Sequence, residues 1–501
     1  MKNRMLNIVA SLLLLCVVAC SPVAPEKYSE SDSLPQIYPD YVNVTIPCNI
    51  APLTFEINDE ADDYLTRLSS GGAELLVGGK TVAPSIKKWR ELLQAATGGE
   101  IKVEVFLCRN DRWTLTAPFS YFVSPDSIDP YISYRLIPPS YVGYEKLTIN
   151  QRSLADYEEK VIYNNMLSSI EDKAQCINCH AYKNYRTDNM QFHLRQTNGG
   201  TIFVNDGKIV KLNMATDSTL SPGVYPAFNP VYDVVAYSVN KTGQIFHTRN
   251  RNKVEVQDVA SDVIIYNPAA NVVTNVSDSP DDLEVFPYWS PDGKTLYYGS
   301  AHFVITDTAR TMMQEEIMRY RDIKYDILCR SWNPETFEFS APDTIFPASR
   351  MGKSATFPRI SPDGRYLLVA LGEYGCFHVW HKDADLCLID LQTGYYRLLD
   401  EANSPDAESY HSWSSNSRWI LFSSRRDDTN YTRLYIAHVS PDGIDSKAFL
   451  LPQKSPEFYS MFDRSYNVPE FMVEPVRIAP HEFAEYAKGD AVNVKYSTNG
   501  M

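Results

Sequence analysis

Residues 286–293 read Phe-Pro-Tyr-Trp-Ser-Pro-Asp-Gly, and this phrase decides the fold because it recurs along the chain. Residues 225–230 and 357–364 are two further copies, and residues 410–416 are a degenerate fourth copy. Pro, Asp and Gly favour a tight turn, and the apolar residue before Ser-Pro is expected to enter a core between neighbouring sheets. A β-like run follows each copy, at residues 234–238, 295–299, 366–370 and 419–423.

The spacing of the copies predicts a ring of blades. The copies lie 61, 71 and 53 residues apart, measured between Phe228, Trp289, Ile360 and Trp413. These intervals suit four-stranded blades that carry loop insertions. Because such blades cannot bury both faces alone, they are expected to close radially into a propeller.

The repeated phrases resemble the Pro-Asp-Gly repeats of TolB-like propellers, a WD40-like family that is six-bladed and periplasmic. The resemblance covers about residues 200–470 and implies a ring of about six blades, four of which are clear in the sequence. A hairpin at 201–212 is expected to combine with residues 458–472 and close the ring. The family's N-terminal α/β domain is absent here, so its cell-envelope partners are not implied.

Composition excludes several classes of protein. The 501 residues carry 47 Lys and Arg against 62 Asp and Glu, a formal charge of −15, and 44% of the residues are hydrophobic. A disordered or fibrous chain is therefore excluded, and the negative charge makes nucleic-acid binding a poor interpretation. The sequence contains no Ser/His/Asp elbow, P-loop, Rossmann glycine pattern or His-Glu-x-x-His, and we assign no catalytic residue.

Several large side chains of the repeats are expected to be structural. The tryptophans expected in the core are Trp289, Trp413 and Trp419. The histidines expected to be structural are His302, His378, His381 and His411.

The N-terminus has the pattern of an export signal. Lys2 and Arg4 precede an apolar run at 6–19 that is too short to span a bilayer. The run ends in Val-Val-Ala-Cys, which resembles the bacterial lipoprotein cleavage box, so residues 1–20 are predicted to be a lipoprotein signal peptide whose Cys20 is lipidated and becomes the new N-terminus. The alternative is an ordinary signal peptide with an incidental cysteine.

A lipidated Cys20 would fix the location of the protein. No later segment has about 18 uninterrupted apolar residues, so we expect acyl chains alone to hold the protein at the membrane. Residues 21–40, rich in Ser and Pro, read as a flexible tether. The expected location is the bacterial cell envelope, at the outer membrane, on its periplasmic or surface face.

Residues 41–150 are expected to form a small β-rich, sandwich-like domain. One helix is predicted at 86–96, with Trp89, Leu92 and Leu93 on one face. Cys48 and Cys108 either pair as a disulfide in the oxidising compartment or remain two unpaired thiols.

Residues 151–199 contain the most informative motif, Cys176-Ile177-Asn178-Cys179-His180. Two cysteines at this spacing form thioethers with the two vinyl groups of one haem, and the adjacent histidine binds the iron. A thioredoxin-like dithiol would need a βαβ unit, and a zinc site would need two further ligands nearby. We favour one covalent haem c, carried by a helical segment whose apolar face is Leu154, Tyr157, Val161, Met166 and Ile170.

The second axial ligand of the haem iron has two nearby candidates. His193 and Met190 follow His180 by thirteen and ten residues, and Met214 lies further along. We favour His193, because a buried imidazole there would have a metal to satisfy it, and Met190 is the second choice. A distant ligand or an open position is the third possibility.

The predicted fold class is mainly β: a small N-terminal β-rich domain, a helical haem-attachment segment, a propeller of about six blades over 200–475, and a C-terminal tail at 476–501. The chain as a whole resembles a kind of bacterial lipoprotein in which a haem motif precedes a TolB-like propeller. We expect electron transfer or redox sensing, with the propeller docking a redox partner or another envelope protein. The alternatives are a haem enzyme, such as a peroxidase or small-molecule reductase with an open iron position, and a scaffold in which the haem is structural.

Overall fold

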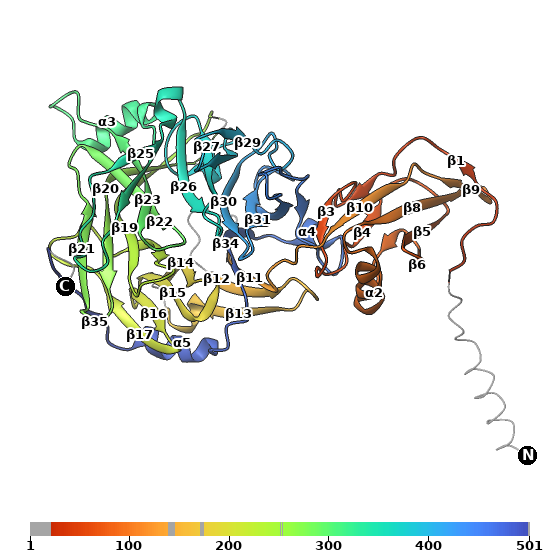
Figure 1. Ribbon diagram of the computed structural model, residues 1–501, viewed down its shortest axis with the longest axis horizontal. Coiled ribbons are helices and arrows are strands. Elements are labelled where there is room, and N and C mark those ends of the chain that lie inside the picture. Colours follow the sequence, from red (N-terminus) through yellow and green to blue (C-terminus); the bar gives the residue numbers. More distant parts are fainter. Residues whose placement is uncertain (1–21, 139–145, 171–174, 251, 253, 499–501) are drawn as a thin grey trace, which may run out of the picture. The chain divides into compact units, whose positions relative to one another are not determined.

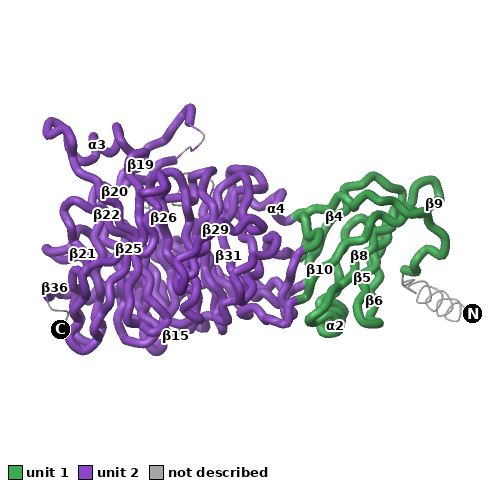
Figure 2. Tube along the Cα trace, turned by 45° about the horizontal axis from the view of Figure 1, so that its top comes forward, with its two compact units in different colours: residues 1–43, 52–123, 454–457 green, residues 44–51, 124–453, 458–501 purple. Residues whose placement is uncertain are grey.

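The computed structural model describes residues 22–138, 146–170, 175–250, 252 and 254–498. The chain divides into two compact units (Figure 2). Unit 1 contains the described residues up to 43, together with 52–123 and 454–457, and unit 2 contains 44–51, 124–453 and the described residues from 458 onward. The predicted signal peptide and Cys20 lie outside the described residues.

Unit 1 is a β-rich body with one helix. The flexible tether predicted at 21–40 is wrong for its described part, because residues 29–30 and 37–38 form strands that pair with other strands of this unit. Helix α2 (Ile86–Ala96) begins after Ser85 and buries Trp89, Leu92, Leu93 and Ala96, which confirms the predicted helix and its apolar face. Cys48 of unit 2 and Cys108 of unit 1 are both free thiols. The strands are β1 (Ser29–Glu30), β2 (Ile37–Tyr38), β4 (Phe55–Ile57), β5 (Asp63–Ser70), β6 (Ala73–Gly78), β7 (Thr81–Val82), β8 (Glu100–Arg109), β9 (Arg112–Leu115) and β10 (Phe119–Ser124).

Unit 2 is a propeller of six sheets, in agreement with the predicted fold class (Figure 1). The six innermost strands contact one another in ring order, β14, β18, β22, β26, β30, β34 and back to β14. From the inside outward, the first two blades are β34 (Ser465–Met472), β11 (Tyr131–Ile137), β12 (Thr148–Ser153) and β13 (Glu159–Asn164), then β14 (Gln175–Lys183), β15 (Arg186–Gln196), β16 (Gly200–Asn205) and β17 (Lys208–Asn213). The next two are β18 (Val224–Phe228), β19 (Val235–Phe246), β20 (Val254–Asn267) and β21 (Val272–Ser277), then β22 (Asp282–Trp289), β23 (Thr295–His302), β24 (Asp326–Ser331) and β25 (Asp343–Phe346). The last two are β26 (Ser354–Ile360), β27 (Tyr366–Gly372), β28 (Asp385–Asp390) and β29 (Tyr396–Leu398), then β30 (Glu408–Trp413), β31 (Trp419–Ser424), β32 (Arg433–His438) and β33 (Phe449–Leu450).

The ring is closed by a different pair of segments from the one we predicted. Strand β34 pairs antiparallel with β11, so the closing blade combines an early and a late part of the chain. The hairpin at 201–212 does form, as β16 and β17, but it completes the blade that begins with β14. Because β34 supplies the innermost strand of the sheet that contains β11, hydrogen bonds between an early and a late part of the chain hold the ring closed.

The helical haem-attachment segment predicted over 151–199 is wrong. Strand β13, a short 3-10 turn, and strands β14 and β15 occupy it, so these residues belong to two propeller blades. The apolar residues that suggested a helix do not share one buried face, because Val161, Met166 and Ile170 are exposed while Leu154 is buried. The propeller therefore begins near Tyr131 and not near residue 200.

The remaining elements lie at the edges of unit 2. These are β3 (Thr45–Pro47), α3 (Met312–Arg319), α4 (Phe458–Met461), α5 (Pro480–Lys488), β35 (Val492–Asn493) and β36 (Lys495–Tyr496). Strands β35 and β36 pair with β17 and β21, so the predicted C-terminal tail adds a strand to the outer edge of two blades. Among the described residues, no helix is both long enough and apolar enough to cross a membrane.

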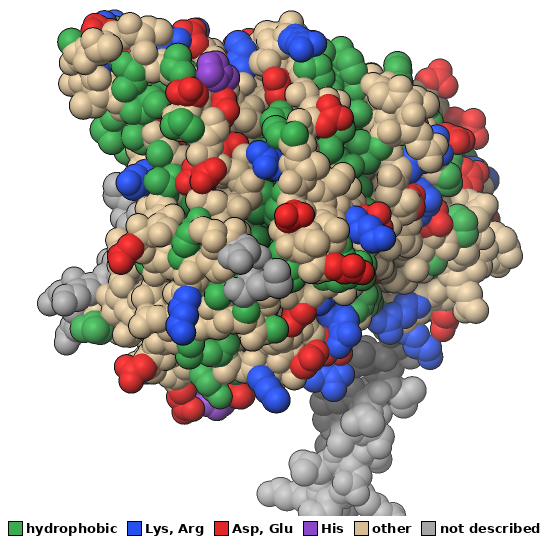
Figure 3. All heavy atoms as spheres, turned by 60° about the vertical axis from the view of Figure 1, so that its left-hand side comes forward, with side chains coloured by type: hydrophobic (Ala, Val, Ile, Leu, Met, Phe, Trp, Pro, Cys, Tyr) green, Lys and Arg blue, Asp and Glu red, His purple; other side chains and the backbone are tan. Residues whose placement is uncertain are grey.

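The expected core residues are buried. Trp289, Trp413 and Trp419 lie at the starts or ends of blade strands with at most 2% of their surface exposed. On the face of the molecule shown in Figure 3, acidic and basic side chains are interspersed.

Candidate functional site

The Cys-x-x-Cys-His motif occupies the same place in its blade as the repeated phrase does in the others. Each innermost strand has a residue with a left-handed backbone conformation, with φ between 48° and 57°. The six are Cys179, Tyr225, Phe286, Phe357, Tyr410 and Val468. A β-bulge accompanies this residue in β14, β18, β22, β26 and β30, and it re-aims the side chain there.

This equivalence could have been found in the sequence. Cys179-His180 aligns with Tyr225-Pro226, Phe286-Pro287 and Phe357-Pro358, and Tyr410-His411 has the same form. The motif is predicted to be a separate segment before the repeats, because Cys179 stands where the repeated phrases have an aromatic residue. The motif is instead the innermost strand of a blade.

Four aromatic rings form a collar at these equivalent positions. The rings of Phe286 and Phe357 are stacked with centroids 4.0 Å apart, Tyr225 lies 4.8 Å from Phe286, and Tyr410 lies 4.9 Å from Phe357. Phe377 lies between 6.1 and 6.3 Å from all four rings and completes the group. The two adjacent blades led by β14 and β34 contribute Cys179 and Val468 in place of an aromatic residue, so the collar is interrupted beside the motif.

Two cavities meet at this interruption. A small cavity of about 30 Å³ is lined by Cys179 and His180 together with the collar residues. A larger cavity of about 360 Å³ is lined by Cys176, Asn178 and His193. Tyr225 and Tyr410 line both cavities, so the motif extends from one to the other.

His180 is buried without a satisfying polar partner. Its side chain is 1% exposed, and neither Nδ1 nor Nε2 makes a hydrogen bond of ordinary geometry with the described residues. Burial, and then the nearby Arg135 charge, lowers the pKa of His180 to about 3, against a smaller opposing effect of the Ser133 and Val468 backbones. The ring is therefore neutral and has nitrogen lone-pair capacity that the protein does not use, which is the state in which imidazole binds a metal.

The two cysteines do not have the character of a redox dithiol. They lie on strand β14 and not at the start of a helix, and burial raises the pKa of the Cys179 thiol. A catalytic dithiol needs a lowered thiol pKa. For zinc, two more ligands would be needed, and the part of the chain that the structure describes contains no group of three His, Cys, Asp or Glu side chains that could hold a metal.

The candidates for a second iron ligand differ in their surroundings. His193 lies on β15 beside Asn178 of β14, and its Nδ1 is 3.0 Å from Thr201 Oγ1, which leaves Nε2 as the nitrogen for a ligand. Burial, with a smaller contribution from Arg195, lowers the pKa of His193 to about 3. Met190 is fully buried in an apolar cluster with Phe192 and Phe483 and is not among the residues lining either cavity. Met214 is buried in the apolar cluster that also contains Tyr237.

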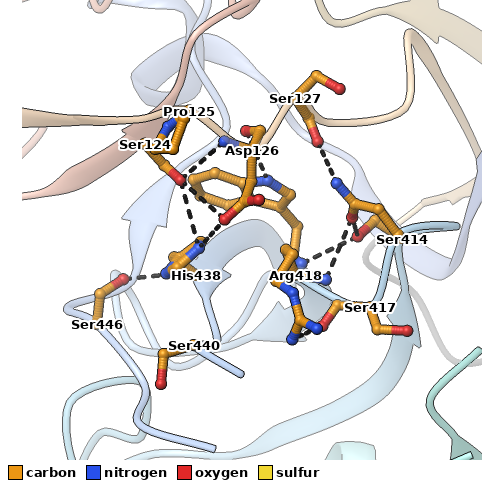
Figure 4. Close-up of polar contacts among 12 residues, drawn as sticks. Ser124, Pro125, Asp126, Ser127, Ser414, Ser417, Arg418, His438, Ser440 and Ser446 are labelled. Atoms are coloured by element: carbon orange, nitrogen blue, oxygen red, sulfur yellow. Dashed lines mark hydrogen bonds and ion pairs between the residues drawn. The ribbon is translucent and has the colours of Figure 1, made fainter. Parts of the chain in front are cut away.

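A second set of polar residues resembles a hydrolytic triad but lacks its geometry (Figure 4). Ser124 Oγ lies 3.4 Å from His438 Nε2, and Asp126 Oδ2 lies 3.0 Å from the same nitrogen. In a triad the serine and the acid contact different ring nitrogens. Ser124 also donates to Asp126, so this group connects the end of β10 and the loop after it to β32 and does not activate a nucleophile.

The histidines expected to be structural each contact a neighbouring part of the fold. His378 contacts Thr356, His381 contacts Glu255 and His411 contacts the Leu368 carbonyl. His302 contacts Asp282 at 2.9 Å.

No protein-family model and no curated protein matches this chain. Similar solved structures include an ACO/RPE65 chimera, with 11% identity over 88% of this chain and 97% of that chain and a TM-score of 0.38. Oligogalacturonate lyase from Vibrio parahaemolyticus has 12% identity over 83% of this chain and 100% of that chain, with a TM-score of 0.32. The tricorn protease has 10% identity over 81% of this chain and 37% of that chain, with a TM-score of 0.36.

Proposed function

We propose that the propeller carries one covalently attached haem c per chain and acts in electron transfer or redox sensing. Cys176 and Cys179 would form the two thioether bonds, and His180 would bind the iron. The observation that carries this proposal is the buried imidazole of His180 directly after Cys179, whose two ring nitrogens make no hydrogen bond of ordinary geometry with the described residues. A bond to iron would use a ring nitrogen of His180 whose burial without a partner otherwise lowers the stability of the folded state by about 1–3 kcal/mol.

His193 would supply the second axial ligand. It lines the same cavity as Cys176, and the Thr201 contact at Nδ1 fixes which ring nitrogen remains. When bound, the haem supplies a one-electron couple between ferric and ferrous iron. The cavity beside Cys176 and His193 is lined by both apolar and polar side chains. Two imidazole ligands would leave no open position for a substrate.

We further propose a cell location and partners. Cys20 would carry a lipid anchor at the outer membrane of a bacterial envelope, and the propeller would dock a redox partner or another envelope protein. Replacing Cys20 by Ser should move the protein from the membrane fraction to the soluble fraction. Continued membrane association after that change would argue for another anchor.

The test of haem attachment is a haem stain on a denaturing gel, using protein matured in a host that attaches haem after export. We expect a stain in the wild type and none after Cys176→Ala and Cys179→Ala together. The matched control changes two buried cysteines of other segments, Cys376→Ala and Cys387→Ala, and should keep the stain. A stain that survives loss of both motif cysteines would overturn covalent attachment.

A haem enzyme is the second candidate, and the size of the larger cavity favours it. About 360 Å³ beside His193 is within the range of small-molecule sites. Spectra of His193→Ala and Met190→Ala, in both oxidation states, separate the candidates. We expect His193→Ala to convert low-spin iron to high-spin iron, whereas Met190→Ala should not. If Met190→Ala gives high-spin iron and His193→Ala does not, the ligand is Met190. If neither spectrum changes, neither residue binds the iron and the haem-enzyme candidate is favoured.

A further inference from the structure

A third cavity, of about 360 Å³, is not used by the proposed haem attachment. This tyrosine cavity is lined by Tyr182, Tyr185 and Tyr288, and it shares Arg359 and Glu470 with the small cavity beside the motif. Five blades contribute to its wall, those led by β14, β18, β22, β26 and β34. Its volume is within the range of small-molecule sites.

The two charged side chains of this wall pair with each other. Arg359 donates from Nη2 to Glu470 Oε1 at 3.0 Å, and each side chain is 20% exposed. The described residues that line the cavity include no other Lys, Arg, Asp or Glu. Because the pair is neutral as a whole, the wall favours an uncharged ligand over a carboxylate or a phosphate.

Two hydrogen-bond donors of the wall lack an acceptor of ordinary geometry among the described residues. They are the buried hydroxyl of Tyr182 and Nε1 of Trp289, whose side chain is 2% exposed. Burial raises the pKa of Tyr182, against a smaller opposing effect of Ser133, so the hydroxyl keeps its proton and can donate. The two donors lie on β14 and β22, which the blade led by β18 separates.

Much of the remaining wall is apolar and has flat faces. The guanidinium of Arg359 lies over the Tyr288 ring at 4.8 Å from its centre. Four prolines and two phenylalanines also line the cavity, namely Pro226, Pro230, Pro291, Pro362, Phe228 and Phe471. A planar ring suits such a wall, because aromatic side chains bind flat groups by stacked or edge-on contact.

The supply of acceptors argues against a sugar. Each sugar hydroxyl donates as well as accepts, so it needs an acceptor in the wall. The carboxylate of Glu470 already accepts from Arg359, and the Asn184 amide already donates to the Pro230 carbonyl at 2.6 Å. A carbonyl oxygen only accepts, and it would satisfy a donor such as Tyr182 without adding a donor of its own.

We propose that the tyrosine cavity binds an uncharged planar ligand with carbonyl oxygens on opposite sides of a ring, which is the chemical class of the quinones. The Tyr182 hydroxyl and Trp289 Nε1 would donate to the two oxygens, and the ring would lie against the proline and aromatic side chains. Binding of this kind does not require the haem, so the inference goes beyond the proposed function and does not rest on it.

The experiment is a calorimetric titration of the full-length protein with duroquinone. The four methyl groups of this quinone occupy its ring positions, so it does not add to cysteine thiols. We expect saturable binding at one site per chain. Tyr182→Phe keeps the ring and removes the donor, so it should weaken binding by about threefold to tenfold.

The matched control is Tyr395→Phe, because Tyr395 is 67% exposed and lines none of the three cavities. It should bind duroquinone as the wild type does. Absence of saturable binding in the wild type would overturn the quinone site. Equal affinities of the wild type and Tyr182→Phe would overturn it too, because they would place the quinone elsewhere.

Methyl glucoside separates a quinone from a sugar, and we expect no binding of it. Binding of methyl glucoside that Tyr182→Phe weakens would assign the cavity to a sugar and overturn the proposal. The haem stain is measured on the same preparation. Quinone binding by unstained protein would overturn the haem proposal alone, and stained protein that binds no quinone would overturn this inference alone.

Discussion

At the scale of single residues, the burial of His180 is expected to lower the free energy of unfolding of the haem-free protein. Neither ring nitrogen makes a hydrogen bond of ordinary geometry with the described residues, so burial of this imidazole lowers the stability of the folded state unless another group binds it. In a haem-free background of Cys176→Ala and Cys179→Ala, we expect His180→Met to leave the free energy of unfolding unchanged or to raise it by about 1 kcal/mol. Urea denaturation measures this, and a loss of more than about 2 kcal/mol would identify His180 as a structural residue.

Glu316 on α3 predicts a pH dependence of stability. It is fully buried, both carboxylate oxygens are unpartnered among the described residues, and burial followed by the Asp258 charge raises its pKa to about 8. A raised pKa of an acid means that the folded state retains the proton. The stability contributed by this group is therefore complete below the ordinary pKa near 4.5 and declines as the pH rises toward 8.

Replacing Glu316 by Gln should reduce this decline and stabilise the protein at pH 8, because the amide has no charge to desolvate. Urea denaturation at pH 5 and pH 8 measures the effect, with the exposed Glu335→Gln as the control. An unchanged difference in unfolding free energy between the two pH values would rule out this role for Glu316.

At the scale of elements, two turns with the same Pro-Asp-Gly sequence should respond differently to alanine. Gly293 and Gly364 both have left-handed conformations, with φ of 70° and 75°. A Cβ at Gly364 meets no atom closer than 3.9 Å, so we expect Gly364→Ala to cost about 1 kcal/mol from backbone strain alone. A Cβ at Gly293 collides with Asn229 of the preceding blade, whose side chain donates to the Gly293 carbonyl.

We therefore expect Gly293→Ala to cost about 1–2 kcal/mol more than Gly364→Ala. Denaturant unfolding of Gly364→Ala, Gly293→Ala, Asn229→Ala and the Asn229→Ala/Gly293→Ala double variant measures both terms. Equal costs, or a double variant whose cost is the sum of the single costs, would show that the Asn229 contact is not the cause.

The repeated phrases were sufficient to predict the propeller, because each one fixes a turn, a core residue and the strand that follows. Strands β19, β23, β27 and β31 include nearly all of the predicted runs. The motif segment was predicted as a helix because Leu154, Tyr157 and Val161 have helix-like spacing. Apolar spacing over one short stretch does not separate a helix from strands and turns when tertiary pairing decides the outcome.

At the scale of the whole molecule, the sequence predicts the late segment that closes the ring but not its partner strand β11, nor the residues that share a cavity with the motif. Arg135 and Asn467 are 332 residues apart in the chain and form a hydrogen bond between β11 and β34. The motif residues and His193 were predicted from local patterns, whereas Arg135 lines the larger cavity from β11. Contacts of this kind depend on ring closure, which no local pattern records.

The most direct test of covalent haem attachment in the propeller is the mass of one tryptic peptide. Residues 174–183 contain the whole motif between two lysine cleavage sites, Lys173 and Lys183. In protein matured after export in a host that attaches haem, we predict that this peptide carries the mass of one haem through Cys176 and Cys179. Recovery of the peptide at its unmodified mass, from protein that the same host exports and folds, would contradict the proposal.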